Sequence, residues 1–188
     1  GAGFLRLSGG TATLAGTANL TNFTETGGTL GGTGAVTVSG QSSWTGGTIT
    51  GSLRNSGTLT ISAGNIKFLD GTLTNTGTVA VTDNIYTHVD GGAINNQAGA
   101  TVDFQADAVL SNYNPFIGIF FSGQTFTNAG TLKKSAGTGI SEVDYSVTNT
   151  GTINVQTGTL GLTAGGNFSG TSTFTESPNS IPDLASGT

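Results

Sequence analysis

The side chains that could do acid/base chemistry are few in this sequence. Its 188 residues include ten acidic side chains, five basic ones, one His and no Cys. Asp103 and Asp107 lie close together in the sequence, and Asp83 precedes Asp103 by one length of the repeat described below. If folding brings two of these carboxyls to about 5–9 Å, they could act as the acid and base of a glycoside hydrolase. Because no Arg or second base accompanies them, we expect no catalytic residue and no enzymatic activity.

A second pair of carboxylates, and the single His, could bind a metal. Asp70 and Asp90 are separated by the same interval as Asp83 and Asp103, each directly before a Gly, and could share a cation. Asp-Gly is equally typical of a turn, and we favour that interpretation. His88 lies in an alternating run and has no second ligand at a suitable spacing, so we expect an outward-facing strand residue. The sequence therefore predicts no metal and no cofactor.

Composition narrows the classes of partner. Charged residues make up 8% of the chain, against about 25% in ordinary soluble domains, and the net charge is −5. Such a chain has no basic surface for nucleic acid or anionic lipid, and its apolar runs are too short to cross a bilayer. We expect no nucleic-acid partner and no membrane insertion. Disorder is also disfavoured, because it combines low hydrophobicity with high charge.

The elements that must position these side chains come from a repeat. Its unit reads apolar-x-Asn-x-Gly-Thr-apolar-x-apolar, as in residues 53–61, 73–81 and 147–155. The Asn positions are Asn55, Asn75, Asn96, Asn128 and Asn149, and two further copies carry Gly at positions 32 and 170. The interval between consecutive copies is nearly constant, except for one much longer interval between Asn96 and Asn128.

The repeat predicts an all-β fold. Apolar residues alternate with Thr, Ser or Asn, as in strands with one buried face, and Asn-x-Gly supplies a left-handed or otherwise tight corner. A unit of about 20 residues without helical spacing is too short for a βαβ crossover, so successive units must stack coil on coil. We therefore expect a single-stranded parallel β-helix, or β-solenoid, of roughly eight coils over residues 1–175. Residues 176–188 are expected to form a linker or capping tail.

Stacking in register predicts the interior of the solenoid. Two rows of apolar side chains should point inward, one on each side of the corner. The first is Leu53, Leu73, Ile94, Phe126 and Val147, and the second is Leu59, Val79, Leu132 and Ile153. The five Asn side chains should form a ladder of amide hydrogen bonds from coil to coil. Lys133-Lys134 interrupts the second row, so we expect one Lys to mark a locally distorted coil.

The long interval holds an aromatic insertion. Its aromatic side chains are Tyr113, Phe116, Phe120 and Phe121. Solenoids place insertions on one face, often a binding face, so these residues are candidates for contact with a sugar, a surface or a neighbouring chain. The alternative, which we favour, is a hairpin packed on the flank of the solenoid, since an exposed patch of this kind would promote aggregation.

Several phrases of the repeat resemble a known class of proteins. Residues 44–49, 94–101, 126–132 and 147–152 are similar to the degenerate repeats of large bacterial secreted and surface proteins, the adhesin-like β-solenoids that include autotransporter passengers and filamentous-haemagglutinin-like stalks. The resemblance runs from Gly27 to Phe174. It implies an extracellular, cell-surface segment that acts as a rigid spacer or adhesive scaffold, and no catalytic residue carries over.

Two further expectations concern context and partners. Because the chain contains no Met, we expect it to be a piece of a longer protein. Unpaired backbone at the two ends of a solenoid favours end-to-end self-association, alongside a glycan or a surface as partner. The alternative function is a carbohydrate-binding or carbohydrate-active β-helix, with Asp83, Asp103 and Asp107 on an acidic strip.

Overall fold

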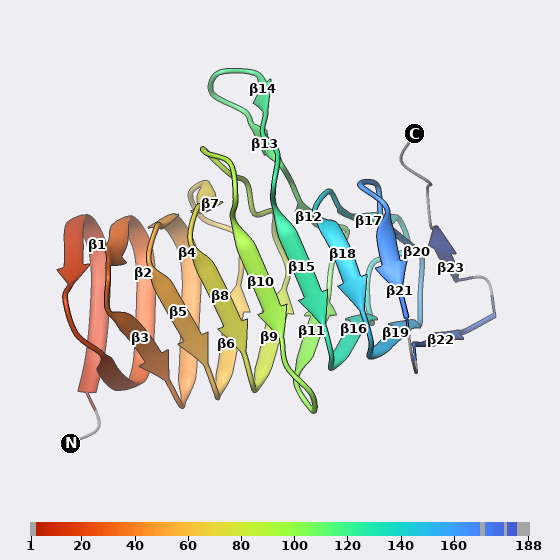
Figure 1. The fold of residues 1–188 in the computed structure, drawn as a ribbon, viewed down its shortest axis with the longest axis horizontal. Helices are drawn as coiled ribbons and strands as arrows, with labels where there is room; N and C mark the ends of the chain where they lie inside the picture. The colour runs from red at the N-terminus through yellow and green to blue at the C-terminus, as the bar shows by residue number, and fades with distance from the viewer. Residues whose placement is uncertain (1–2, 170–171, 179, 184–188) are drawn as a thin grey trace.

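The chain winds into a parallel β-solenoid of about nine turns in a computed structural model that describes residues 3–169, 172–178 and 180–183 (Figure 1). The strands lie side by side along the long axis, with the N-terminus at one end and the C-terminal strands at the other. Within these ranges the chain forms no helix, and so none that could cross a membrane. The predicted fold class is confirmed.

Each turn of the solenoid bends between its extended segments, so these segments form three stacks of parallel strands, here called the first, second and third walls. The first wall consists of β3 (Ala35–Val38), β5 (Ser52–Asn55), β8 (Thr72–Asn75), β10 (Ala93–Asn96), β15 (Thr125–Asn128), β18 (Ser146–Asn149) and β21 (Gly166–Phe168). The second consists of β6 (Thr58–Ile61), β9 (Thr78–Val81), β11 (Thr101–Phe104), β16 (Thr131–Lys134), β19 (Thr152–Val155) and β22 (Thr173–Glu176). The third consists of β7 (Lys67–Leu69), β12 (Val109–Leu110), β17 (Ile140–Val143), β20 (Thr159–Gly161) and β23 (Ile181–Asp183).

The N-terminal coils use longer strands that bend from one wall into the next. They are β1 (Gly3–Leu14), β2 (Ala18–Gly32) and β4 (Gln41–Ile49). The first half of β4 pairs with β6 and its second half with β7, so a single strand crosses a corner. At the opposite end, β23 pairs in parallel with β20, so part of the predicted 176–188 tail lies against the last coil of the third wall.

The core is narrow and follows the predicted rows. Leu53, Leu73, Ile94, Phe126 and Val147 are buried and lie in direct register through β5, β8, β10, β15 and β18. The second row is buried as well, and Val102 completes it between Val79 and Leu132. Burying one such aliphatic side chain stabilises the fold by about 1.5–3 kcal/mol. Repetition over the coils therefore supplies a core from few apolar residues.

The Asn ladder is continuous over five coils, as predicted. The side-chain Nδ2 of each Asn donates to the Oδ1 of the next, at 2.8 Å from Asn55 to Asn75, 2.9 Å to Asn96, 2.7 Å to Asn128 and 2.6 Å to Asn149. All five side chains are fully buried. A buried amide without partners would cost about 1–3 kcal/mol, so the ladder both requires and enforces strict vertical stacking.

Two of the predicted copies of the repeat need comment. The copy at Gly32 is wrong, because Val38 and not Gly32 is the register partner of Asn55. Gly32 instead pairs with Leu14 at the end of β2. The copy at Gly170 lies outside the described residues. The N-terminal coil has Val38 where the later coils have Asn, so the sequence pattern did not show which of its residues aligns with Asn55.

The corner glycines serve a different purpose from the one expected. Gly57, Gly77 and Gly151 do not adopt a positive φ. Instead, a Cβ on Gly77 would lie 2.2 Å from the carbonyl oxygen of Gly57, and one on Gly151 would lie 2.1 Å from that of Gly130. Glycine is required there because consecutive corners stack too closely for a side chain.

Candidate functional site

The aromatic insertion forms a hairpin that projects from the solenoid at the top of Figure 1. Its strands are β13 (Tyr113–Asn114) and β14 (Ile119–Phe120), the only antiparallel pair among the described strands. The turn is held by Asn114, whose Oδ1 accepts from the backbone N–H of Phe116 at 2.9 Å and whose carbonyl accepts from Gly118, which has a φ of 69°. These are the conformations that Asn and Gly favour in turns.

The hairpin is exposed for most of its length. The side chains of Phe116 and Phe120 are 70% and 71% exposed, and those of Ile117 and Ile119 about half. Phe116 leans back on the solenoid, with its ring centroid 5.9 Å from that of Phe68. The favoured alternative of a hairpin packed on the flank is therefore wrong, since four of its apolar side chains are exposed to solvent instead of being buried against the solenoid.

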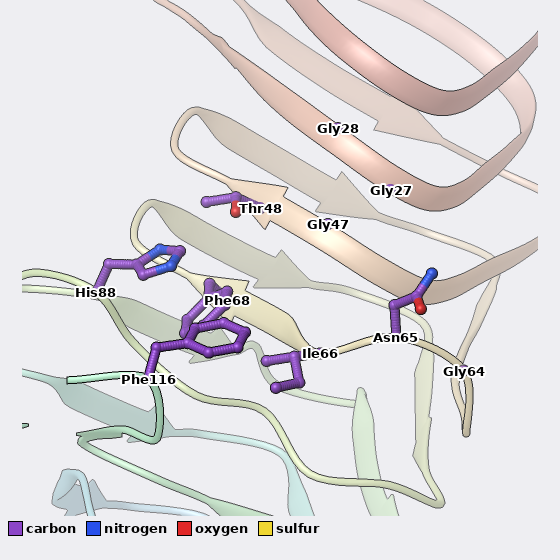
Figure 2. A pocket seen from close by; sticks show the side chains of 10 residues that line it. All are labelled: Gly27, Gly28, Gly47, Thr48, Gly64, Asn65, Ile66, Phe68, His88 and Phe116. Atoms are coloured by element: carbon purple, nitrogen blue, oxygen red, sulfur yellow. The ribbon is translucent and has the colours of Figure 1, made fainter. Parts of the chain in front are cut away.

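A groove of about 620 Å³ lies beneath the tip of this hairpin (Figure 2). It crosses successive coils from β2 through β4 and β7 to the segment that follows Tyr86. Its lining residues are Gly27, Gly28, Gly47, Thr48, Gly64, Asn65, Ile66, Phe68, His88 and Phe116. The four coils are separated by three intervals of about 4.8 Å, so the groove is roughly 14 Å long.

The floor of the groove is bare backbone for a physical reason. The sequence Thr-Gly-Gly-Thr occurs at 26–29 and again at 45–48, on neighbouring coils. Gly28 and Gly47 have φ values of 96° and 103°, a region that L-residues with a Cβ rarely adopt. A Cβ at Gly28 would lie 2.6 Å from the carbonyl oxygen of Gly10. No side chain can therefore fill the floor without moving the coil beneath it.

The wall of the groove carries a fixed imidazole. The ring of His88 stacks on Phe68 with 3.3 Å between centroids and 19° between planes. Its Nδ1 lies 3.0 Å from Oδ2 of Asp70, and its backbone N–H donates to Oδ1 of the same carboxylate at 2.7 Å. Asp70 is 7% exposed and His88 34%. Since Nδ1 faces Asp70, Nε2 is the nitrogen that a molecule in the groove can reach.

Several predicted site residues do not meet at this groove. The Phe120 ring packs against that of Tyr113 on the hairpin, with 4.8 Å between centroids and 42° between planes, and lines a separate depression of about 280 Å³. Phe121 lines another of about 450 Å³. Of the four predicted aromatic residues, only Phe116 contributes to the groove. The prediction that His88 lies in a strand is wrong, because pairing in this segment ends at Tyr86.

The two carboxylates considered for a shared cation are used in different loops. Asp70 binds His88 and accepts from the hydroxyl of Thr87 at 3.3 Å. Asp90 accepts from the backbone N–H of Ser122 at 2.7 Å and so fastens the base of the hairpin. Within the described ranges, no three His, Asp or Glu side chains come close enough together to hold a metal ion.

The proposed acidic strip is occupied by lysines. Asp83 pairs with Lys67 at 2.6 Å, Asp107 with Lys134 at 2.8 Å, and Asp103 with Lys133 at 3.5 Å. The hydrogen bond from Lys134 holds the pKa of the Asp107 carboxyl below its usual value, which disfavours a role as general acid. The arrangement gives no support to a carboxylate pair for glycoside hydrolysis.

Lys134 itself corrects an expectation. It points inward and is fully buried, yet β16 keeps a regular register with β11 and β19, so the coil is not distorted. Its ammonium group contacts Asp107, the Ser141 hydroxyl at 3.0 Å and the Ala136 carbonyl at 3.2 Å. The charge is tolerated because several oxygen acceptors replace water.

Sequence reasoning missed two buried charged residues near the groove. Lys67 is fully buried and donates to the carbonyls of Ser62 and Asn65 as well as to Asp83. Glu25 is fully buried, and no described residue bonds to either of its carboxyl oxygens. Burial raises the pKa of Glu25 to about 8. The inward position of Glu25 could have been predicted, because Glu25 follows Phe23 by two residues in an alternating strand. The inward position of Lys67 could not, because its immediate neighbours are all apolar and show no alternation.

Comparisons with known proteins give no relative for this chain. No protein-family model matches it, and neither the curated proteins nor the solved structures include a significant match. The β-solenoid fold therefore stands on the structure, and the resemblance to adhesin-like proteins on the repeat pattern alone.

Proposed function

We propose that this chain is a non-enzymatic structural segment of a longer extracellular protein, a rigid spacer at a bacterial cell surface with an adhesive contact at the β13–β14 hairpin. The observation that carries the proposal is the continuous, fully buried Asn ladder within a narrow, repetitive core. A solenoid whose coils each contact only their neighbours transmits force along its axis and keeps a fixed length.

The composition supports an exposed setting. The chain has no Cys and few charges, so its stability depends on neither disulfides nor a redox environment. The outward positions of the first wall carry mostly Thr and Ser, which favour strands and keep the surface wettable. The exposed hairpin interrupts the regular coils between β12 and β15, as expected for an adhesive contact on a repetitive rod.

The open ends support assembly in line with the axis. The outer edge of β1 is unpaired in the described chain, Phe4 on it is 62% exposed, and Leu5 and Leu14 are only partly covered. A further coil laid on β1 would pair this edge and complete the core. We include end-to-end association with a second copy in the proposal for this reason.

Location is the decisive test. Antibodies raised against the folded chain should label intact cells of the source organism as strongly as permeabilised ones. Labelling that appears only after permeabilisation would overturn the surface role. The carbohydrate-active alternative finds no favouring observation, because its three carboxylates are each paired with Lys.

A further inference from the structure

We propose that the groove beneath Phe116 binds an uncharged, extended polysaccharide strand that lies along the solenoid axis. This inference rests on the proposed adhesive role and names its ligand class. The juxtaposition that carries it is a side-chain-free floor at Gly28 and Gly47, a wall formed by His88 stacked on the buried Phe68, and the exposed ring of Phe116 beside Phe68 (Figure 2).

The shape of the groove favours a linear polymer. It crosses four coils for roughly 14 Å, so a compact small molecule would fill only part of it. The rigid glycine floor is preformed, and a ligand would not have to order a loop there. A strand of about three linked sugar rings has the length and flatness that this trough accommodates.

The charges around the groove and on the protein as a whole disfavour an anionic ligand. No Asp or Glu lines the groove, and the carboxylate nearest to the His88 imidazole, Asp70, already binds it. No Lys or Arg is among the residues that line the groove, so phosphate or uronate groups would lose water without gaining a partner. The protein as a whole carries a net charge of −5, which further disfavours polyanions.

The remaining groups suit a sugar. Aromatic faces attract the polarised C–H groups of a pyranose ring through their quadrupole, and Phe116 presents such a face. The imidazole of His88 adds a part-exposed flat ring, supported from behind by the buried Phe68. The Asn65 amide, the Thr48 hydroxyl and Nε2 of His88 supply donors and acceptors for hydroxyl groups. Few polar groups among apolar ones are typical of sites that fix a ligand's orientation.

An extended peptide is disfavoured by backbone pairing. Peptide strands usually bind by adding to an open sheet edge. Here the groove runs across the strands, and the backbone groups of β4 and β7 are used in parallel ladders with each other and with their neighbours. The remaining peptide mode is a proline-rich strand on an aromatic surface, and the experiment therefore includes one.

The test is calorimetric titration of the intact chain with cellohexaose, xylohexaose and mannohexaose at concentrations up to about 5 mM. The anionic probe is polygalacturonate and the peptide probe is a proline decapeptide. We expect at least one neutral hexasaccharide to bind with a Kd of about 0.1–1 mM, and the anionic and peptide probes not to bind. Failure of all three neutral sugars to bind, or binding of polygalacturonate or the proline peptide in their place, overturns the inference.

Variants locate the site. Phe116→Ala should raise the Kd about tenfold or more, whereas Phe174→Ala, which removes an exposed ring from β22 of the second wall, should change it less than about twofold. His88→Phe keeps an aromatic ring on Phe68 but removes Nε2, and should also weaken binding. Unchanged affinity in Phe116→Ala, or equal losses in both Phe variants, contradicts the assignment.

A measurement on the unsubstituted protein removes any dependence on folding of the variants. Amide NMR shifts on addition of the bound sugar should be confined to the residues that line the groove, including Gly28, Gly47, Asn65, His88 and Phe116, with the second wall unaffected. Failure of sugar binding in a chain that is found on the cell surface overturns this inference alone. Intracellular labelling overturns the proposed function even if sugar binds.

Discussion

The buried carboxyl of Glu25 should make this protein less stable as the pH rises. Glu25 lies inward on β2 between the register partners Leu7 and Trp44, neither of which is charged. Both carboxyl oxygens are unpaired among the described residues, and burial raises the pKa of Glu25 from 4.5 to about 8. The folded state therefore keeps a proton that the unfolded chain has already released between these two pH values.

The sign and size of the effect follow from that difference in pKa. Stability from a raised carboxyl pKa is fully present below pH 4.5 and is lost as the pH rises to about 8. At 1.36 kcal/mol per unit, the full loss is about 5 kcal/mol, of which about 4 kcal/mol falls between pH 5 and pH 8.5. Glu25→Gln has no such proton to lose, so its free energy of unfolding should exceed that of the unsubstituted protein by about 4 kcal/mol at pH 8.5, and the two should nearly coincide at pH 5.

The assay is urea unfolding at constant ionic strength, followed by the fluorescence of Trp44, the single Trp, at several pH values from 5 to 8.5. Glu142→Gln is the matched control, because Glu142 lies outward on β17 and is only partly buried. All other ionisable groups are the same in Glu25→Gln and the unsubstituted protein, so their contributions cancel in the difference. Parallel pH profiles for Glu25→Gln and the unsubstituted protein would refute the account of Glu25 as a buried, unpaired acid.

Three further predictions test the ladder, the buried lysine and the open end. Asn75→Ala should lower the free energy of unfolding by about 3 kcal/mol, because it leaves buried amide partners unpaired. Its control, Asn95→Ala, lies outward on the next coil and should lower that free energy by less than about 1 kcal/mol. Equal losses of the two variants in chemical denaturation would contradict the ladder. Lys134→Ala should lower the free energy of unfolding by about 3 kcal/mol, because the buried ammonium group bonds to several oxygen atoms. Lys133→Ala removes only a part-exposed ion pair and should lower it by less than about 1 kcal/mol in the same assay. The reverse order would contradict a structural role for the buried ammonium group. Light scattering should show concentration-dependent association that Leu5→Lys abolishes by placing a charge at the open core, and a strictly monomeric parent chain would count against end-to-end assembly.

Much of the fold was predictable from the sequence, because the repeat shows both the alternation within a strand and the length of each coil. The near-constant interval between units, the period of two and the recurrence of Asn at one position allow one stacking arrangement, and Asn55 to Asn149 lie where that arrangement puts them. Prediction failed where the repeat loses its marker residue. Val38 replaces Asn in an N-terminal coil, so the copy was assigned to Gly32, one wall away.

The groove was only partly within reach of the sequence. Phe68 and His88 are separated by one coil length, and the Thr-Gly-Gly-Thr pair marks two adjacent rungs, so their vertical alignment could have been inferred. The inclination of Phe116 over Phe68 could not, because the direction of a hairpin depends on contacts at its base. Here those contacts include the hydrogen bond between Asp90 and Ser122, which lie on either side of the insertion.

By itself the sequence determined the solenoid, its inward rows and its Asn ladder, since these follow from a local pattern repeated at a nearly constant interval. Only the tertiary structure decided which charges are buried, how each carboxylate is paired and where the insertion meets the wall. Lys67, Lys134 and Glu25 face the interior at positions where the pattern calls for apolar side chains. Whether such a charge is paired depends on side chains one coil away. Lys67 forms an ion pair with Asp83, whereas the carboxyl oxygens of Glu25 have no hydrogen-bond partner among the described residues.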